Sequence, residues 1–355
     1  MARAAINPAL VVTSEIPPKK LGDVFIYYSN ETAPDESEQE NYKTIIGWLR
    51  TSADPKVLRI AGQLESDLRD FRSAVDFETA SLKQTFRMAP SDDTSAALIF
   101  TNRLSRDGNF EVLLPGISEA RVGRFPILKN PDLILRSNPL GTLDGLKAAL
   151  KIAAIEFDPR LHNFVLVTKS HGKRDLAFTP RLAVLASETS PGEILSVARA
   201  DGETSENAPR WVINRRGLAK ASYFQSISEA GAQTGLFFSA IFMESCASED
   251  LDGGDSGPSA KNIGLLFTTQ GSTPYRTLDY GSIFAGRRAG ESISARLVAS
   301  LEKKSASYGV PSRKTEIPTF WYFVPLAAFC GYALSSWVRG RITSKRHLPT
   351  SRDAS

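Results

Sequence analysis

Continuous apolar runs alternate along this chain with segments in which apolar residues recur at helical spacing. The apolar runs predict buried strands at 23–29, 96–101, 163–170, 236–243 and 262–269. Helical periodicity predicts helices at 36–50, 54–88, 142–157 and 281–303. Strands that are apolar throughout and alternate with helices indicate an α/β fold, with a mostly parallel sheet flanked by helices on both faces.

Turn-forming and polar residues mark the connections between these elements. The turn Arg106–Asn109 separates NRLS from FEVLL and predicts a hairpin. Residues 115–140 are irregular and contain Pro, whereas 187–220 and 247–261 read as loops rich in polar residues and Gly.

One apolar segment near the C-terminus is long enough to cross a membrane. Residues 317–338 form a run of 22 residues without a charge, which is about 33 Å as a helix against a hydrocarbon core of about 30 Å. Trp321, Tyr322 and Trp337 lie near its ends, where amphipathic rings favour the membrane interface. The alternative is a buried core helix. We predict a transmembrane helix at 317–338, preceded by a juxtamembrane linker at 304–316.

The net charge of +4 resides in the tail after this segment. Residues 339–355 hold five Lys and Arg against one Asp, so the remaining chain carries equal numbers of acids and bases. Phosphate contacts need a basic face on the folded domain, and a neutral body argues against nucleic acid as a partner. A basic tail next to a span suits an anionic headgroup surface.

The N-terminus shows no export signal. Asn7 and Pro8 interrupt its only apolar candidate, and we predict a disordered leader at 1–22. The main domain then spans 23–303. Without an export signal, this domain is expected to stay in the cytoplasm as part of a single-pass, tail-anchored membrane protein.

Chemistry centres on two residues that each follow a predicted strand. The chain has two Cys and three His; His171 follows the strand at 163–170, and Cys246 follows the strand at 236–243. Adjacent parallel strands would bring them together at the rim of the sheet, where a histidine can activate a thiolate nucleophile. The backbone N–H groups of Gly172 and Cys246 are candidates for an oxyanion hole. The alternative is a structural Cys and an unrelated loop His.

These residues resemble a known family. An apolar strand followed by His-Gly (FVLVTKSHG) and a later apolar strand followed by acid-x-Cys (AIFMESC) are similar to the caspase-like cysteine peptidases, which include metacaspases, legumain and clostripain. The segment LLFTTQGSTPYRTLDYGSIF resembles a clostripain-type strand and the residues after it. The resemblance implies a caspase-like fold and a cysteine endopeptidase with Cys246 as nucleophile and His171 as acid and base.

The same resemblance implies substrate-binding residues. In relatives with basic specificity, an acid two residues before the cysteine lines the first specificity pocket, which assigns Glu244 to Arg or Lys of a substrate. Asp279 is a second candidate for this pocket, and Asn is the second candidate residue at the cleavage point. The alternative is that Glu244 merely caps the end of its strand.

The resemblance has further implications for cofactors and for processing. No cofactor is required, although clostripain relatives suggest calcium for the acidic loop that contains Glu249, Asp250, Asp252 and Asp255; such loops are more often empty. The arginines at 199, 210, 215 and 216 are candidate self-processing sites of a zymogen.

Two other functions compete with a membrane-anchored endopeptidase that cuts a partner protein. The first is a catalytically inactive caspase-like adaptor that is recruited to the membrane by residues 317–338. The second is a transpeptidase similar to the catalytic subunit of the GPI transamidase, which would need an export signal.

Overall fold

The computed structural model describes residues 8–12, 15–30, 43, 45–47, 49–51, 53, 55–70, 74–127, 139–173, 176–179, 196–199, 211–214, 218–245, 261–269, 291–293, 295–297 and 299–300. The chain divides into two compact units, Met1–Val310 and Pro311–Ser355, and all described residues belong to the first. Within these described ranges, no helix has both the length and the apolar character to cross a membrane. The predicted span 317–338, its linker 304–316 and the tail 339–355 lie outside them.

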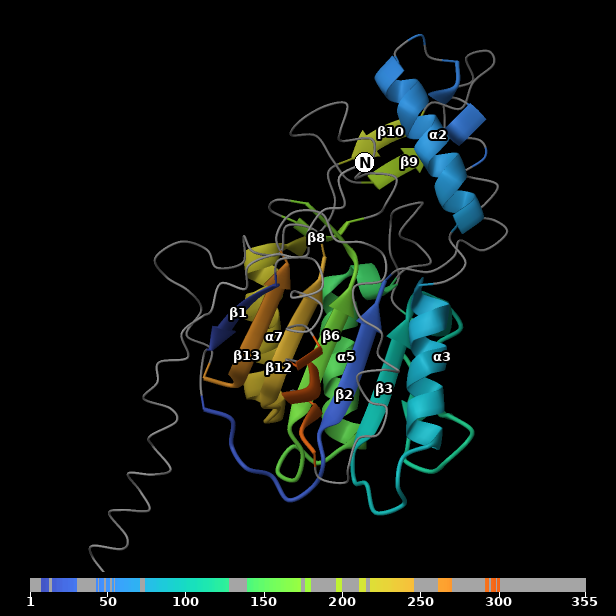
Figure 1. Ribbon diagram of the computed structural model, residues 1–355. Helices are drawn as coiled ribbons and strands as arrows, with labels where there is room; N and C mark the ends of the chain where they lie inside the picture. Colours follow the sequence, from blue (N-terminus) through green and yellow to red (C-terminus); the bar gives the residue numbers. More distant parts are fainter. Residues whose placement is uncertain are drawn as a thin grey trace, which may run out of the picture. The chain divides into compact units, whose positions relative to one another are not determined.

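Strands and helices alternate along most of the first unit (Figure 1). The strands are β1 (Pro8–Val12), β2 (Val24–Ser29), β3 (Ala96–Thr101), β4 (Asn109–Leu113), β5 (Arg121–Arg124), β6 (Phe164–Lys169), β7 (His171–Lys173), β8 (Leu176–Thr179), β9 (Ser196–Arg199), β10 (Trp211–Asn214), β11 (Leu218–Ala219), β12 (Phe238–Glu244) and β13 (Ile263–Thr269). The helices are α2 (Pro55–Asp70), α3 (Ala74–Arg87), α4 (Asn102–Arg106), α5 (Leu143–Glu156), α7 (Lys220–Thr234) and the 3-10 helix η1 (Pro139–Gly141).

The main sheet has eight strands in the order β1-β13-β12-β6-β2-β3-β4-β5. The five strands from β13 to β3 are mutually parallel, whereas β1 and the pair β4 and β5 are antiparallel additions at the two edges. The predicted mixed α/β fold with a mostly parallel sheet is therefore confirmed, and the five predicted strands are β2, β3, β6, β12 and β13.

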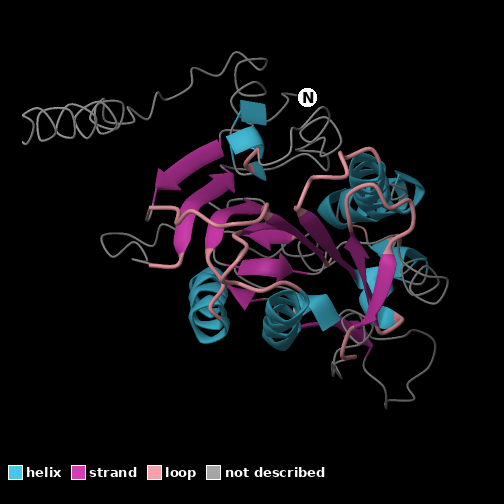
Figure 2. Ribbon diagram, turned by 90° about the horizontal axis from the view of Figure 1, so that it is seen from below, coloured by secondary structure: helices cyan, strands magenta, loops and turns pink. Residues whose placement is uncertain are grey.

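Helices cover both faces of this sheet, and Figure 2 shows them on either side of the strands. On one face, α5 and α7 pack their apolar residues against β6 and β12. On the other face, α3 packs against β2, β3 and β6, together with Ile293 and Leu297. Strands β2, β3, β6 and β12 are buried along their whole length, which explains why their sequences are apolar on both faces.

Helix α5 shows how local sequence sets a boundary. Thr142 precedes the helix in extended conformation, and its hydroxyl accepts a hydrogen bond from Gly145 N at 3.0 Å. A Cβ atom at Gly145 would lie 2.1 Å from the Pro139 carbonyl oxygen, so only glycine fits this close approach. The helix ends before Phe157, at the boundary that the sequence predicts.

The structure corrects the predicted leader. Residues 8–12 form β1, an antiparallel edge strand on β13, within the segment 1–22 that we predicted to be disordered. The short run Pro8–Val12 lacks charges, and a Pro at the first residue of an edge strand leaves the ladder intact. Further along, Asn163 Nδ2 donates to the Pro17 carbonyl at 2.8 Å, so this segment is also tied to the sheet.

Three further predictions of local structure are wrong in part. NRLS is not a strand but the short helix α4, capped by Thr101, so the hairpin joins β3 to β4 around it. The region 115–140 contains β5, and 187–220 contains the short strands β9, β10 and β11. These strands have four residues or fewer, which is too short for a periodic pattern.

Candidate functional site

The carboxyl ends of three central strands meet at one edge of the sheet. Strand β6 lies between β2 and β12 (Figure 1), and Lys169 at its end pairs in register with Ser29 of β2 and Glu244 of β12. Two backbone hydrogen bonds extend this register: Asn30 N donates to Lys169 O at 3.2 Å, and Ser170 N donates to Glu244 O at 3.3 Å. Ligand sites in open α/β sheets form beyond such carboxyl ends.

The predicted dyad follows two of these strands. The prediction that the strands before His171 and Cys246 are adjacent and parallel is confirmed by the pairing of β6 with β12. His171 comes two residues after Lys169, and Cys246 comes two residues after Glu244. Cys246 itself lies just outside the described residues, which end here at Ser245. The dyad therefore stays a prediction on a confirmed arrangement of strands.

His171 and Gly172 begin β7, which forms an antiparallel hairpin with β8. His171 is partly exposed, whereas Gly172 is buried. The register of the hairpin shifts between these two residues, and Phe178 is the extra residue on the opposite strand. Phe178 has a φ of 56°, which is unusual for a bulky residue. Bulges of this kind re-aim neighbouring side chains and recur beside active sites.

The strained Phe178 is held by packing. Its ring is buried and meets Tyr28 of β2 edge to face, with ring centroids 5.6 Å apart. The Tyr28 hydroxyl in turn donates to the Leu140 carbonyl at 2.9 Å. The hairpin that carries His171 is therefore fixed against the central strand β2, since an αL backbone at a non-glycine residue persists only where its surroundings enforce it.

A cluster of buried ionisable side chains lies below this edge, on the α3 side of the sheet. Lys169 Nζ lies 2.8 Å from Glu78 Oε1 of α3 and 3.6 Å from Glu244 Oε1. The Tyr27 hydroxyl of β2 donates to Glu78 Oε2 at 2.5 Å. The side chains of Lys169, Glu78 and Glu244 are 3%, 0% and 2% exposed. We call Tyr27, Glu78, Lys169 and Glu244 the buried ion cluster.

Glu78 has the perturbed acidity in this cluster. Burial, followed by the charge of Glu244, raises the pKa of Glu78 to about 8, although Lys169 and Tyr27 oppose the shift. A cluster of two carboxylates and one ammonium is neutral when one carboxylate carries a proton. Because its pKa is raised to about 8, Glu78 is the carboxyl that holds this proton at neutral pH.

This placement matters for the predicted specificity residues. Glu244 is buried, and its nearest described cation is Lys169, so any substrate cation would compete with that ammonium. Asp279 lies outside the described residues, as does the acidic loop that was considered for calcium. Among the residues that the structure describes, no group of His, Cys, Asp and Glu side chains could hold a metal ion.

Sequence reasoning missed Glu78 and Lys169, although both leave a signal. Glu78 occupies the apolar stripe of α3 with Val75, Leu82 and Phe86, at spacings of three and four residues. Lys169 alternates in phase with the buried Val165 and Val167 of β6. A charged residue in a buried stripe indicates a buried partner.

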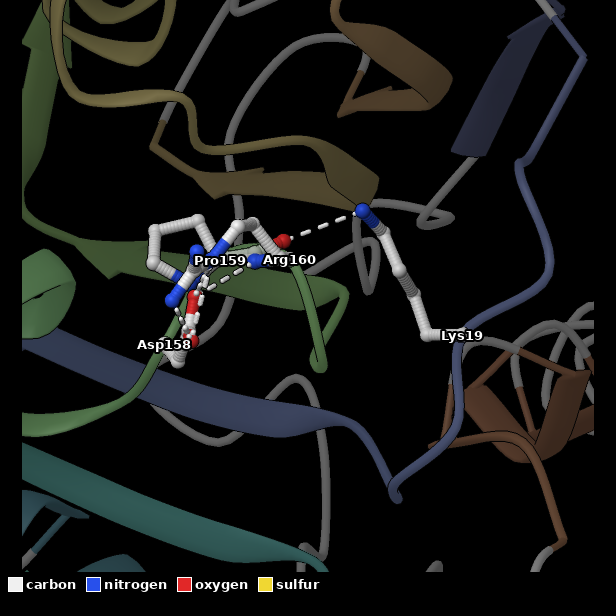
Figure 3. A network of polar contacts seen from close by, with 4 residues as sticks. All are labelled: Lys19, Asp158, Pro159 and Arg160. Carbon is white, nitrogen blue, oxygen red and sulfur yellow. Dashed lines mark hydrogen bonds and ion pairs between the residues drawn. The ribbon is translucent and has the colours of Figure 1, made fainter.

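The opposite end of β6 also carries charges, but at the surface. In the turn before β6, Arg160 pairs with Asp158, and Lys19 Nζ donates to the Pro159 carbonyl at 3.0 Å (Figure 3). The Arg160 hydrogen bonds lower the pKa of Asp158 to about 2. Nearby, the ring of His162 is buried against Phe157, and its Nδ1 lies 2.7 Å from Gly22 O. His162 is thus a structural residue.

The chain shows little similarity to known proteins. No family model and no curated protein matches the chain. One solved structure, a secreted C11 cysteine protease from Bacteroides thetaiotaomicron called iotapain, is similar with a TM-score of 0.33 and 12% identity. The match covers 80% of this chain and 62% of that protein. A similarity of this size carries no argument about fold or function.

Proposed function

We propose that this protein is a cysteine endopeptidase of the caspase-like type, with Cys246 as nucleophile and His171 as general acid and base. The observation that carries the proposal is the register of β6 with β12. Their paired ends, Lys169 and Glu244, each precede one member of the dyad by two residues. Neighbouring strands are about 4.8 Å apart, which suits a nucleophile and a base that must come within hydrogen-bonding reach.

The proposed reaction has two stages. The Cys246 thiolate attacks a peptide carbonyl carbon, the carbon–nitrogen bond breaks, and His171 gives a proton to the leaving amine. The backbone N–H groups of Gly172 and Cys246 stabilise the oxyanion. Water then attacks the thioester with His171 as base, which releases the carboxylic acid and restores the thiol.

Cleavage after Arg or Lys belongs to the proposal on the strength of the sequence, through Glu244 and Asp279. Glu244 is buried beside Lys169, so the proposal that it binds a substrate cation needs a direct test. Peptides with Arg, Lys, Asn or Asp before the cleaved bond discriminate directly. The highest kcat/KM on Arg or Lys supports the assignment, and preference for Asp contradicts it.

Anchoring by residues 317–338 is the second part that rests on sequence. We propose that this segment holds the protein in a membrane with the peptidase domain on the cytoplasmic side. Carbonate extraction of membranes from expressing cells tests the anchor, because an anchored chain stays in the pellet. Protease protection of intact vesicles then tests the orientation.

The central experiment compares the wild-type full chain with Cys246→Ala and Cys330→Ser. Cys246 and Cys330 are the two cysteines of the sequence, so the second variant is a matched control for loss of a thiol. We expect Cys246→Ala to abolish peptide hydrolysis and Cys330→Ser to retain it. Self-processing after the arginines at 199, 210, 215 or 216 predicts two fragments for the wild type and one intact chain for Cys246→Ala.

An inactive adaptor makes the opposite prediction. It hydrolyses no peptide, and an acyloxymethylketone probe labels Cys246 no faster than a denatured-chain thiol. Either result in a folded wild-type chain would overturn the peptidase assignment.

A further inference from the structure

Three side chains of the buried ion cluster connect two neighbouring strands to a helix on the same face of the sheet. Lys169 comes from β6, Glu244 from β12 and Glu78 from α3, and the single Nζ atom of Lys169 approaches both carboxylates. The in-register pairing of Lys169 with Glu244 puts their side chains on the same face of neighbouring strands. The Lys169 side chain therefore clamps the ends of β6 and β12 together and ties both to α3.

The position of this clamp relates it to the proposed dyad. His171 is two residues after Lys169 in the sequence, and Cys246 is two residues after Glu244. A displacement of either strand end is therefore passed on to the side chain that follows. Catalysis is sensitive to such shifts, because a misplacement of about 1 Å can lower the rate about 100-fold.

The electrostatic composition of the cluster makes Lys169 its central member. The ionisable groups that meet there are Tyr27 from β2, Glu78 from α3, Lys169 from β6 and Glu244 from β12. Lys169 is the single cation among these four. Without it, the carboxyl groups of Glu78 on α3 and Glu244 on β12 would be buried with no cation between them, and their charges would repel when both ionise.

We infer that Lys169 is a positioning residue of the candidate active site, and that Glu244 serves as its partner. This inference replaces the pocket role proposed for Glu244 above, so that cleavage after Arg or Lys would rest on Asp279. The inference rests on the proposed function for its catalytic consequence. Its physical content, the effect of Lys169 on the environment of Cys246, is measurable without turnover. Lys169 acts through the strand ends and touches no reacting atom in this assignment.

The test uses the full chain in a Cys330→Ser background, where Cys246 is the one remaining thiol. The variants are Lys169→Met, Lys169→Arg and Glu244→Gln. Lys83→Met is the matched control, because Lys83 of α3 also pairs with a carboxylate, Glu111, but its side chain is 44% exposed. The first readout is kcat and KM on peptides with Arg or Ala before the cleaved bond. The second readout is the pH dependence of iodoacetamide alkylation at Cys246, which reports the pKa of the thiol.

Positioning predicts a specific pattern in both readouts. Lys169→Met should lower kcat at least about tenfold with KM within about twofold, the signature of an interaction that counts in the transition state. It should also shift the alkylation profile to higher pH, whereas Lys169→Arg restores both values in part and Lys83→Met changes neither. Glu244→Gln should lower kcat on Arg and Ala peptides by the same factor.

Two results overturn the inference. In the first, folded Lys169→Met has the kcat and the alkylation profile of Lys83→Met. In the second, Glu244→Gln raises KM for Arg peptides alone, which makes Glu244 a substrate contact. If Lys169→Met does not fold, Glu244→Gln and Lys169→Arg decide the question, because each keeps the shape of the cluster. A wild-type chain without peptidase activity overturns the proposed function, and the alkylation profiles still decide whether Lys169 sets the environment of Cys246.

Discussion

The two ends of strand β6 carry charged groups in opposite surroundings. Before the strand, the Arg160 side chain is 88% exposed and pairs with Asp158 in a surface turn. After it, Lys169 is 3% exposed and is enclosed by Glu78 and Glu244. The pKa of Asp158 falls to about 2 because Arg160 stabilises the carboxylate, whereas the pKa of Glu78 rises to about 8 because burial opposes ionisation.

This difference shows what each end of the strand contributes. The exposed turn is a local contact that water and salt can replace, and such pairs add little stability. The buried cluster must keep its cation, because loss of Lys169 leaves carboxylate charge in a medium that cannot solvate it. Under the inference above, this cluster takes the place of an apolar core because it holds the ends of β6 and β12 in register.

The largest effect is expected from Lys169→Met. This change leaves Glu244 and Glu78 buried without a cation, and loss of one partner of a buried pair costs about 3–5 kcal/mol of unfolding free energy. The cost should be smaller at pH 5 than at pH 8, because protonation relieves the repulsion between the carboxylates. Urea unfolding at both pH values measures it.

The matched control is Lys83→Met, which removes an exposed partner of Glu111. Its urea midpoint should remain close to that of the wild type. Equal urea midpoints for Lys169→Met and Lys83→Met would mean that the buried cluster contributes no more stability than a surface ion pair. That result would contradict the difference between the buried and exposed charges.

The next effect concerns Glu78 and pH. The pKa of this carboxyl is raised from an ordinary 4.5 to about 8 in the folded chain, so the unfolded chain ionises first as pH rises. Stability is therefore lost between pH 4.5 and about 8, and the loss reaches about 3 kcal/mol at pH 7. Glu78→Gln should remove this dependence and make the protein more stable than the wild type above pH 8.

The measurement is the urea midpoint of wild type and Glu78→Gln at half-unit steps from pH 4 to pH 9. Two parallel curves would show that Glu78 ionises normally in the folded chain. They would also contradict the neutral form of the cluster at pH 7. Asp76→Asn, an exposed change in the first turn of the same helix, is the control for general effects of charge on α3.

A smaller effect is expected from Tyr27→Phe. The Tyr27 hydroxyl donates to Glu78 at 2.5 Å, and loss of one buried hydrogen bond costs about 1 kcal/mol. That donor also lowers the pKa of Glu78, so its removal should move the upper end of the pH-dependent window above pH 8. The same urea series detects the shift. Tyr28→Phe, which loses a hydrogen bond to Leu140 on the other face, should leave the window in place.

Much of the fold could be predicted from the sequence because its central strands are buried on both faces. Each of β2, β3, β6 and β12 is an apolar run that needs no knowledge of its neighbours to be identified. Helix α7 was missed because its buried face consists of Phe224, Ile227 and Ala230, a stripe too weak to stand out among polar residues.

Less of the site could be predicted from the sequence, because the site depends on which residues of β6 and β12 lie side by side. The strands before His171 and Cys246 were identified, but the pairing of Lys169 with Glu244 depends on Ser239, an extra residue in β12 relative to β6. That bulge moves Ala240, Phe242 and Glu244 onto the α3 face, and without it Glu244 would point to the other side of the sheet. No local sequence pattern predicts such a shift in the register of β12.

The smallest effect is expected at the exposed end of β6, from Asp158→Asn and Arg160→Met. Asn at position 158 can still accept the hydrogen bond that Arg160 N donates at 2.9 Å, so the turn keeps its backbone contact. The lowered pKa of Asp158 means that its contribution is present above its ordinary value of 3.8 and is lost only as pH falls towards about 2. Between pH 5 and pH 9, both variants should therefore follow the wild-type stability curve in parallel.

Added salt should distinguish the charge interactions at the two ends of β6. Screening at about 1 M salt reduces the range of exposed charge interactions to about 3 Å, so any small difference between Arg160→Met and the wild type should vanish there. The deficit of Lys169→Met should persist, because its carboxylates are enclosed by protein and the ions of the solvent cannot approach them. A deficit of Lys169→Met that disappears in salt would show that water reaches the cluster, and Lys169 could then no longer act as a rigid clamp between β6 and β12.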